Sequence, residues 1–175
     1  MTKLLGISGS LRAGSFNTML VQEAARAFAP DHFQMADLNL PLFDEDVEAN
    51  GIPASVTALC DQVAWADALV ISTPEYNKGP SGVMKNALDW ISRVRPMRTI
   101  AKPTAVLSAT AGIAGGQRAK SAMYLFLIPF QVKLILDPEV NVGQASQKFG
   151  DDGHLSDEAT QQFLQKLMDA LKASI

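Results

Sequence analysis

The sequence has few side chains that bind metals or change oxidation state. Among its 175 residues there are one cysteine, Cys60, and two histidines, His32 and His154. A single thiol can form neither an internal disulfide nor a dithiol redox pair, and it cannot hold an iron–sulfur cluster. The histidines stand far apart, with no histidine or cysteine at ligand spacing, so we expect no metal site. Cys60 lies at helical spacing from Val56 and Val63, which is typical of a small buried hydrophobe.

An excess of positive charge and a long apolar run are also missing. The formal net charge is -3, which offers no electrostatic attraction for nucleic acid. No apolar run reaches the roughly 18 residues of a membrane span, and no basic and apolar signal-peptide regions precede the first strand pattern. We therefore expect a cytoplasmic protein that binds neither nucleic acid nor a membrane. With 47% hydrophobic and 19% charged residues, residues 1–175 are predicted to form one domain.

Two familiar phosphate-binding motifs are absent as well. The glycines Gly6, Gly9 and Gly14 do not match the spacing G-x-G-x-x-G, and G-K-[ST] occurs nowhere in the chain. A dinucleotide-binding Rossmann loop and an ATP-binding P-loop are therefore both disfavoured.

The stretch GSLRAGSFN, residues 9–17, nevertheless has the chemistry of an anion site. It lies between an apolar run that suits a buried strand, residues 4–7, and a helical pattern that runs to Phe28. The first turn of a helix presents free NH groups and the positive end of the helix dipole to the preceding loop. Serine and asparagine are also ordinary helix caps, but the density of donors together with an arginine favours an anion. The candidate ligands are Ser10, Arg12, Ser15, Asn17 and Thr18.

Strand and helix patterns alternate along the rest of the chain. We predict strands at residues 33–36, 67–72, 103–108 and 131–136, and helices at residues 53–65, 81–93, 116–127 and about 157–174. Such alternation implies parallel pairing with helices on both faces of the sheet. The predicted fold is an α/β, flavodoxin-like, doubly wound parallel five-stranded sheet with strand order 2-1-3-4-5. Ligands of such sheets bind beyond the carboxyl ends of the strands, beside the first and third strands.

The loops after the third and fourth strands suit a flat ligand. Residues 73–82 combine prolines, an acid, an aromatic ring, an amide and two glycines before a helix, and residues 111–116 are mostly glycine and alanine. Glycine lets a ligand approach the backbone closely. Together with an anion held by the first loop, this describes a mononucleotide with a large ring system. Flavin mononucleotide (FMN) is the natural candidate.

The stretches GSLRAGSFN and PEYNKGPSGVMKNALDWISR, in this order, resemble the paired signatures of the NADPH-dependent FMN reductase family, which includes quinone, azo and chromate reductases. The similarity extends over nearly the whole chain, including LPLFDED at residues 40–46 and FGDDGHLSDE before the last helix. It implies an enzyme that transfers hydride from NADPH or NADH through bound FMN to a small acceptor such as a quinone, free flavin, azo compound or chromate. The flavin performs this chemistry, so no catalytic side chain is expected.

The resemblance also implies which residues bind FMN. The phosphate would be held by Ser10, Arg12, Ser15, Asn17 and Thr18. The flavin would lie along Pro74, Glu75, Tyr76, Asn77 and Gly79, with Ser108, Thr110 and Gly112 on its other side. In the family a proline usually precedes the glycine that matches Gly82, whereas Ser81 stands there in this chain. The conformation of the turn at residues 78–81 is therefore left open.

Two other functions stay open at this point. A flavodoxin-type electron carrier would share the fold and FMN but pass single electrons to protein partners. A nucleotide-processing hydrolase or transferase could use a similar anion loop, and that protein would be colourless.

The run AMYLFLIPF, residues 122–130, is more apolar than one helix face requires. Together with Trp90 it predicts a homodimer or homotetramer. The alternative is a helix that is buried within the monomer.

Overall fold

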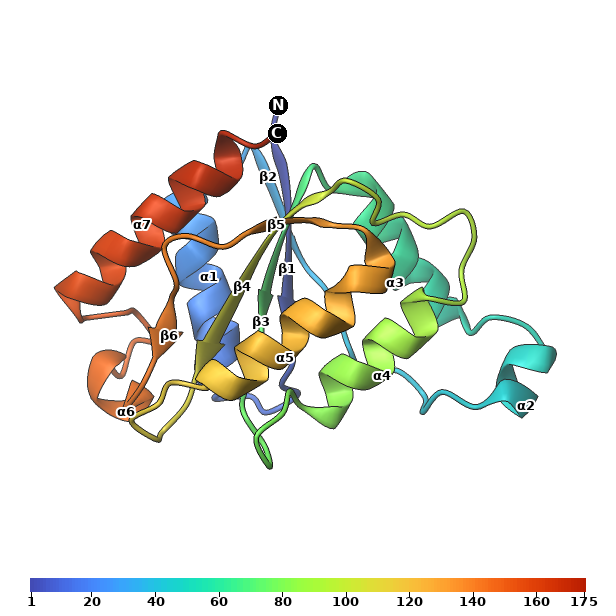
Figure 1. Cartoon of the computed structure of the whole chain (residues 1–175), viewed down its shortest axis with the longest axis horizontal. Coiled ribbons are helices and arrows are strands. Elements are labelled where there is room, and N and C mark those ends of the chain that lie inside the picture. The colour runs from blue at the N-terminus through green and yellow to red at the C-terminus, as the bar shows by residue number, and fades with distance from the viewer.

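A parallel sheet forms the centre of the computed structural model, which describes all residues, 1–175 (Figure 1). Its strands are β1 (Lys3–Ser8), β2 (His32–Met35), β3 (Ala68–Ser72), β4 (Pro103–Ala109), β5 (Lys133–Ile135) and β6 (Asn141–Val142). The order β2-β1-β3-β4-β5 confirms the predicted flavodoxin-like topology. The short strand β6 pairs with the carboxyl end of β4.

Helices cover both faces of this sheet (Figure 1). They are α1 (Phe16–Phe28), α2 (Glu45–Ala49), α3 (Ala54–Trp65), α4 (Gly82–Ile91), α5 (Gln117–Leu127), α6 (Ala145–Lys148) and α7 (Glu158–Lys172), with a 3-10 turn at Ile128–Phe130. α1 and α7 pack together on one face, and α3, α4 and α5 lie on the other. None of the helices is both long and apolar enough to cross a membrane.

Alternation along the strands explains why both faces are covered. Successive side chains of a strand point to opposite faces, and Leu4 of β1 belongs to the apolar cluster of α1 and α7 while Leu5 belongs to that of α3 and α4. Val70 and Ile71 of β3 divide in the same way. Each face therefore has its own apolar core, and β3 is buried along its whole length. Short continuous apolar runs are what a parallel sheet covered on both sides requires.

Trp90 and Cys60 belong to the core on the α3 and α4 face. Trp90 is fully buried, its Nε1 donates a hydrogen bond to the carbonyl of Pro41 at 2.8 Å, and its ring meets Phe43 edge-on with 5.0 Å between centroids. It is therefore a core residue of the monomer and offers no surface to a partner. Cys60 is also buried, and this burial together with the charge of Asp61 raises the pKa of its thiol to about 11. The thiol is therefore protonated and unreactive at neutral pH.

The main differences from the predicted elements lie after α5. The strand predicted at residues 131–136 is reduced to the three residues of β5, because the 3-10 turn ends at Gln131 in the left-handed region (φ 55°). The sequence also predicts none of α2, α6 and β6, which have only five, four and two residues. Segments this short carry too little periodicity to be recognised. Of these, β6 matters for the site, because it supports the loop after β4.

Candidate functional site

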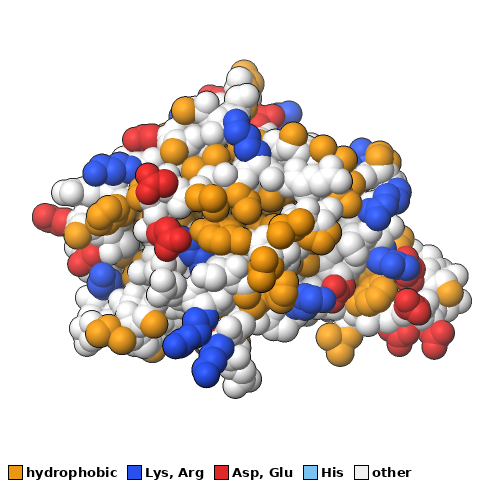
Figure 2. Space-filling model, in the orientation of Figure 1, with side chains coloured by type: hydrophobic (Ala, Val, Ile, Leu, Met, Phe, Trp, Pro, Cys, Tyr) orange, Lys and Arg blue, Asp and Glu red, His pale blue; other side chains and the backbone are white.

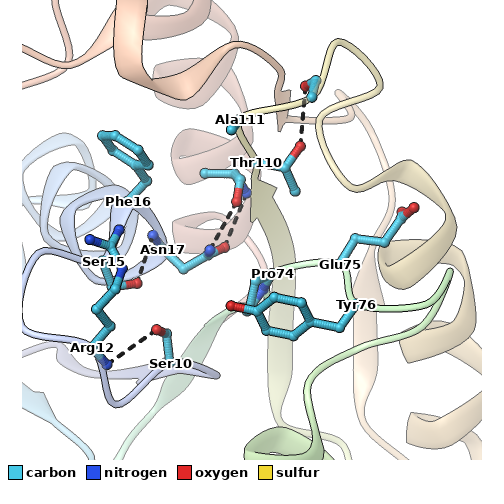
Figure 3. A pocket seen from close by; sticks show the side chains of 12 residues that line it. Ser10, Arg12, Ser15, Phe16, Asn17, Pro74, Glu75, Tyr76, Thr110 and Ala111 are labelled. Carbon is cyan, nitrogen blue, oxygen red and sulfur yellow. Dashed lines mark hydrogen bonds between the residues drawn. The ribbon is translucent and has the colours of Figure 1, made fainter.

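The carboxyl ends of β1, β3 and β4 open into a cavity of about 360 Å³ (Figure 3). Three loops surround it: residues 9–15 after β1, 73–81 after β3 and 110–116 after β4. Its volume lies in the range of small-molecule and cofactor sites. The lining consists of Ser10, Arg12, Ser15, Phe16, Asn17, Pro74, Glu75, Tyr76, Ala109, Thr110, Ala111 and Gly112.

Most of the site residues predicted from the sequence line this cavity. Those that do not are Thr18, Asn77, Gly79 and Ser108. The sequence interpretation missed Phe16, Ala109 and Ala111. Alanine has no functional group, and an aromatic residue at the start of a helix is typical of core packing. The only available signal was their position directly beside predicted site residues.

The first loop and the start of α1 form the polar end of the cavity. Ser15 is buried, and its Oγ accepts hydrogen bonds from the backbone NH groups of Asn17 and Thr18 at 3.2 and 3.4 Å. Arg12 is exposed, and its guanidinium lies over the Phe16 ring, 5.8 Å from the ring centroid. This end therefore combines a helix N-terminus, serine hydroxyls and a cation, which together suit an anion such as a phosphate.

Asn17 belongs to the same helical turn, but its side chain is already paired. It is only 3% exposed. Its Oδ1 accepts hydrogen bonds from the backbone NH of Ala109 at 3.0 Å and from the hydroxyl of Ser72 at 2.8 Å. Its Nδ2 donates to the carbonyl of Ala109 at 2.9 Å (Figure 3). These bonds join the start of α1 to the ends of β3 and β4.

The loop after β3 forms a tight hairpin. Tyr76 and Gly79 exchange two backbone hydrogen bonds, of 2.9 and 3.0 Å, around Asn77 and Lys78. Both central residues have positive φ, 51° and 67°, a region that asparagine visits more readily than most residues. Asn77 and Gly79 thus shape the hairpin without lining the cavity, while the 62% exposed Tyr76 stands at its rim.

The structure shows the conformation of the turn at residues 78–81, which the sequence does not predict. Ser81 has a φ of -64°, close to the value that proline is restricted to, so serine fits the backbone conformation expected for the family's proline. Its Oγ accepts a hydrogen bond from the NH of Met84 at 3.1 Å and donates one to the carbonyl of Gly9 at 2.6 Å. Ser81 therefore caps α4 and ties the loop after β3 to the loop after β1.

Glu75 connects the loop after β3 to α5. Its Oε2 accepts hydrogen bonds from the backbone NH groups of Arg118 and Ala119, at 3.0 and 3.1 Å. A carboxylate is stabilised there, because free NH groups and the positive end of the helix dipole meet at a helix N-terminus. In Figure 3 its carboxylate points toward α5. The contacts of Glu75 are those of a residue that orders the loop.

Close backbone packing fixes the loop after β4. A Cβ at Gly116, which has a φ of 80°, would lie 1.9 Å from Ser108 Oγ, and one at Gly143 would lie 2.2 Å from the carbonyl oxygen of Ile113. Only glycine allows the start of α5 to lie this close to the end of β4, and the residue after β6 to lie this close to the loop after β4. Ser108 is fully buried and donates a hydrogen bond to the carbonyl of Thr73 at 2.7 Å. It therefore joins two strand ends below the cavity and does not face into it.

Comparison with known proteins connects this cavity to a family. A sequence profile described as NADPH-dependent FMN reductase matches residues 2–147. The chain belongs to this family. The resemblance noted in the two motifs is thereby confirmed, and both motifs begin in loops that border the cavity.

Similarity to individual FMN reductase relatives extends over nearly the whole chain. An NAD(P)H-dependent FMN reductase of Pseudomonas aeruginosa is 40% identical, over 97% of this chain and 93% of the relative. A quinone reductase of Escherichia coli is 34% identical, over 90% and 87%. Among solved structures, FerB of Paracoccus denitrificans, a flavoenzyme NAD(P)H:(acceptor) oxidoreductase, matches with a TM-score of 0.87 at 29% identity, over 99% and 96%. The chain is therefore an oxidoreductase of the NAD(P)H-dependent FMN reductase and quinone reductase type.

Proposed function

We propose that this FMN reductase binds FMN non-covalently in the cavity and passes a hydride from NADPH or NADH to a small acceptor such as a quinone. The main support for the proposal is that one cavity contains both the start of α1, which suits an anion, and the space between loops 73–81 and 110–116. FMN, when bound, supplies the hydride chemistry. The chain's own residues hold the cofactor, orient it and leave room for the nicotinamide and then the acceptor.

The phosphate is assigned to the α1 end of the cavity. The Arg12 guanidinium lies over the Phe16 ring and makes no ion pair, so its NH groups are available to phosphate oxygens. Ser10 offers its hydroxyl beside Arg12, and Ser15 orders the first turn of α1. Thr18 does not line the cavity, and its hydroxyl is paired with that of Ser8 at 2.8 Å. Its role is therefore to hold the first turn of α1 against the end of β1.

The flavin ring is assigned to the space between the loops after β3 and β4. Its walls are Pro74, Glu75 and Tyr76 on one side and Thr110 and Gly112 on the other. Gly112 has nothing within 4 Å of its Cβ position, so a flat ring can approach its backbone closely. Three further predicted residues lie outside the cavity and stabilise its walls: Asn77, Gly79 and Ser108.

A flavin absorbance spectrum tests this proposal. The purified protein, or the protein after incubation with FMN and removal of unbound cofactor, is expected to be yellow. Heat or acid should then release a flavin that elutes with authentic FMN, because no covalent attachment is expected. A colourless protein that takes up no FMN in a titration would contradict the proposal and favour the nucleotide-processing alternative.

We further propose that the protein forms a homodimer or homotetramer through the α5 surface. Leu125 and Ile128 are 67% and 66% exposed, and Figure 2 shows hydrophobic side chains gathered over α5 and its surroundings. A hollow of about 340 Å³ lies between α4 and α5 and includes Leu88, Phe126 and Phe130. An exposed apolar area of this kind is typical of an interface. Trp90 takes no part, because it is buried in the monomer.

Sedimentation at micromolar concentration tests the assembly. Wild-type protein is expected to sediment at two or four times the 18.8 kDa of one chain, and Leu125→Glu is expected to shift it toward the monomer by placing a charge in the apolar contact. A matched control is Phe163→Glu, which changes a 51% exposed side chain on α7, on the opposite face of the sheet. A wild-type protein that sediments only at 18.8 kDa would refute the assembly.

A further inference from the structure

We infer that Asn17 is a positioning residue, whose side chain locks the phosphate end of the site to the ends of β3 and β4 and does not itself bind phosphate. The inference rests on the proposed function, because it concerns the same cofactor cavity. It assigns Asn17 a role different from the one that its place in the loop motif implies.

The hydrogen bonds of Asn17 leave its side chain little capacity for a ligand. An amide oxygen has two lone pairs, and those of Asn17 are taken by the backbone NH of Ala109 and the hydroxyl of Ser72. One of the two NH donors of Nδ2 is taken by the carbonyl of Ala109. The side chain is also nearly fully buried. Turning it toward a phosphate would leave three buried polar groups unpaired, which is costly.

The partners of Asn17 show what this side chain positions. Ala109 is the last residue of β4 and lines the cavity directly before Thr110 and Ala111. Ser72 is the last residue of β3, and Thr73 and Pro74 follow it. Ala109 and Ser72 are 92 and 55 residues from Asn17 in the sequence. One amide thus joins the ends of two strands to the helix turn beside Arg12, so the phosphate end and the ring walls are held as one unit.

Holding the walls in place before the ligand arrives lowers the cost of ordering them on binding. Without the Asn17 amide, Ala109 at the end of β4, directly before residues 110–112, loses two hydrogen bonds that fix it to α1. This loss weakens every ligand that uses the ring walls, whether or not it carries a phosphate. A direct phosphate contact would behave differently, because its removal would weaken only a ligand that has the phosphate.

Parallel titrations with FMN and riboflavin, which lacks the phosphate, separate the two roles. Asn17→Ala is expected to weaken FMN and riboflavin by the same factor, roughly tenfold. Ser72→Ala removes a single hydroxyl partner of Asn17 outside the cavity lining, and it is expected to weaken both flavins equally and by less. Amide hydrogen exchange should accelerate at residues 109–112 in Asn17→Ala without FMN present. Thr99→Val is the matched control, because Thr99 donates a comparable buried hydrogen bond, to the carbonyl of Phe130 at 2.7 Å, outside the cavity.

The outcomes distinguish the inference from the proposed function. Equal losses for the two flavins, with unchanged affinities in Thr99→Val, would support the positioning role. A loss confined to FMN, unchanged affinity for both flavins, or an equal loss in Thr99→Val would overturn it. Ser72→Ala gives the same decision if Asn17→Ala does not fold. Wild-type protein that binds neither flavin would overturn the proposed function itself.

Discussion

Arg12→Ala is expected to weaken FMN binding by roughly tenfold to a hundredfold. A hydrogen bond to a charged group contributes about 1.5 to 3 kcal/mol, and each 1.4 kcal/mol corresponds to about a factor of ten in affinity. Arg12 lies at the end of the cavity where the N-terminus of α1 also favours negative charge. It is exposed and contacts the Phe16 ring, so its removal leaves no buried group unpaired. The expected loss is therefore one of binding and not of folding.

Titration of the apo-protein with FMN, followed by flavin fluorescence, measures this effect. Riboflavin should bind the variant and the wild type equally, since it carries no phosphate. Arg12→Lys should fall between the two proteins, because it keeps the charge but loses the planar donor geometry. Unchanged FMN affinity in Arg12→Ala would remove Arg12 from the phosphate site.

When the FMN-loaded protein is mixed with NADH or NADPH, the bound flavin is expected to be fully reduced, and a quinone added afterwards is expected to reoxidise it. The few aromatic side chains around the cavity would leave one face of the flavin accessible, first to the nicotinamide and then to the quinone. Phe16 and Tyr76 are the only aromatic residues in the lining. Phe16 lies at the Arg12 end and Tyr76 is largely exposed at the rim. A flavin with one face uncovered can stack a nicotinamide ring at the roughly 3 to 3.5 Å separation of a near-attack geometry.

Anaerobic stopped-flow absorbance distinguishes this reductase from an electron carrier. The oxidised flavin band should disappear after mixing with at least one of the two nicotinamides and return after a second mix with a quinone. Free FMN at the same concentration is the control, because its slow direct reduction must be subtracted. A carrier would gain from aromatic rings on both flavin faces, which exclude the nicotinamide. Negligible reduction by both NADH and NADPH would therefore support the carrier and contradict the reductase.

The main elements of the fold could be predicted from the sequence because each follows a local pattern. The strands β1, β3 and β4 are buried on both faces, so they appear as short apolar runs, and β4 begins at the predicted residue 103. Their alternation with helical patterns implies parallel pairing, which brings the carboxyl ends of the strands to one edge of the sheet. The loops that follow β1, β3 and β4 are therefore recognisable as the site before any contact is known.

The sequence by itself determined the family, the fold and most of the residues that line the cavity, since these depend on local motifs and their order. Only the tertiary structure decided what several of those side chains contact. Asn17 pairs with Ala109 92 residues away, Ser108 with Thr73 35 residues away, and Trp90 with Pro41 49 residues away. A polar side chain in a motif shows which bonds it can make, but burial and distant partners decide which bonds are left for a ligand. For Asn17 and Ser108 those bonds are used within the protein, because an unpaired polar group below the cavity would be costly.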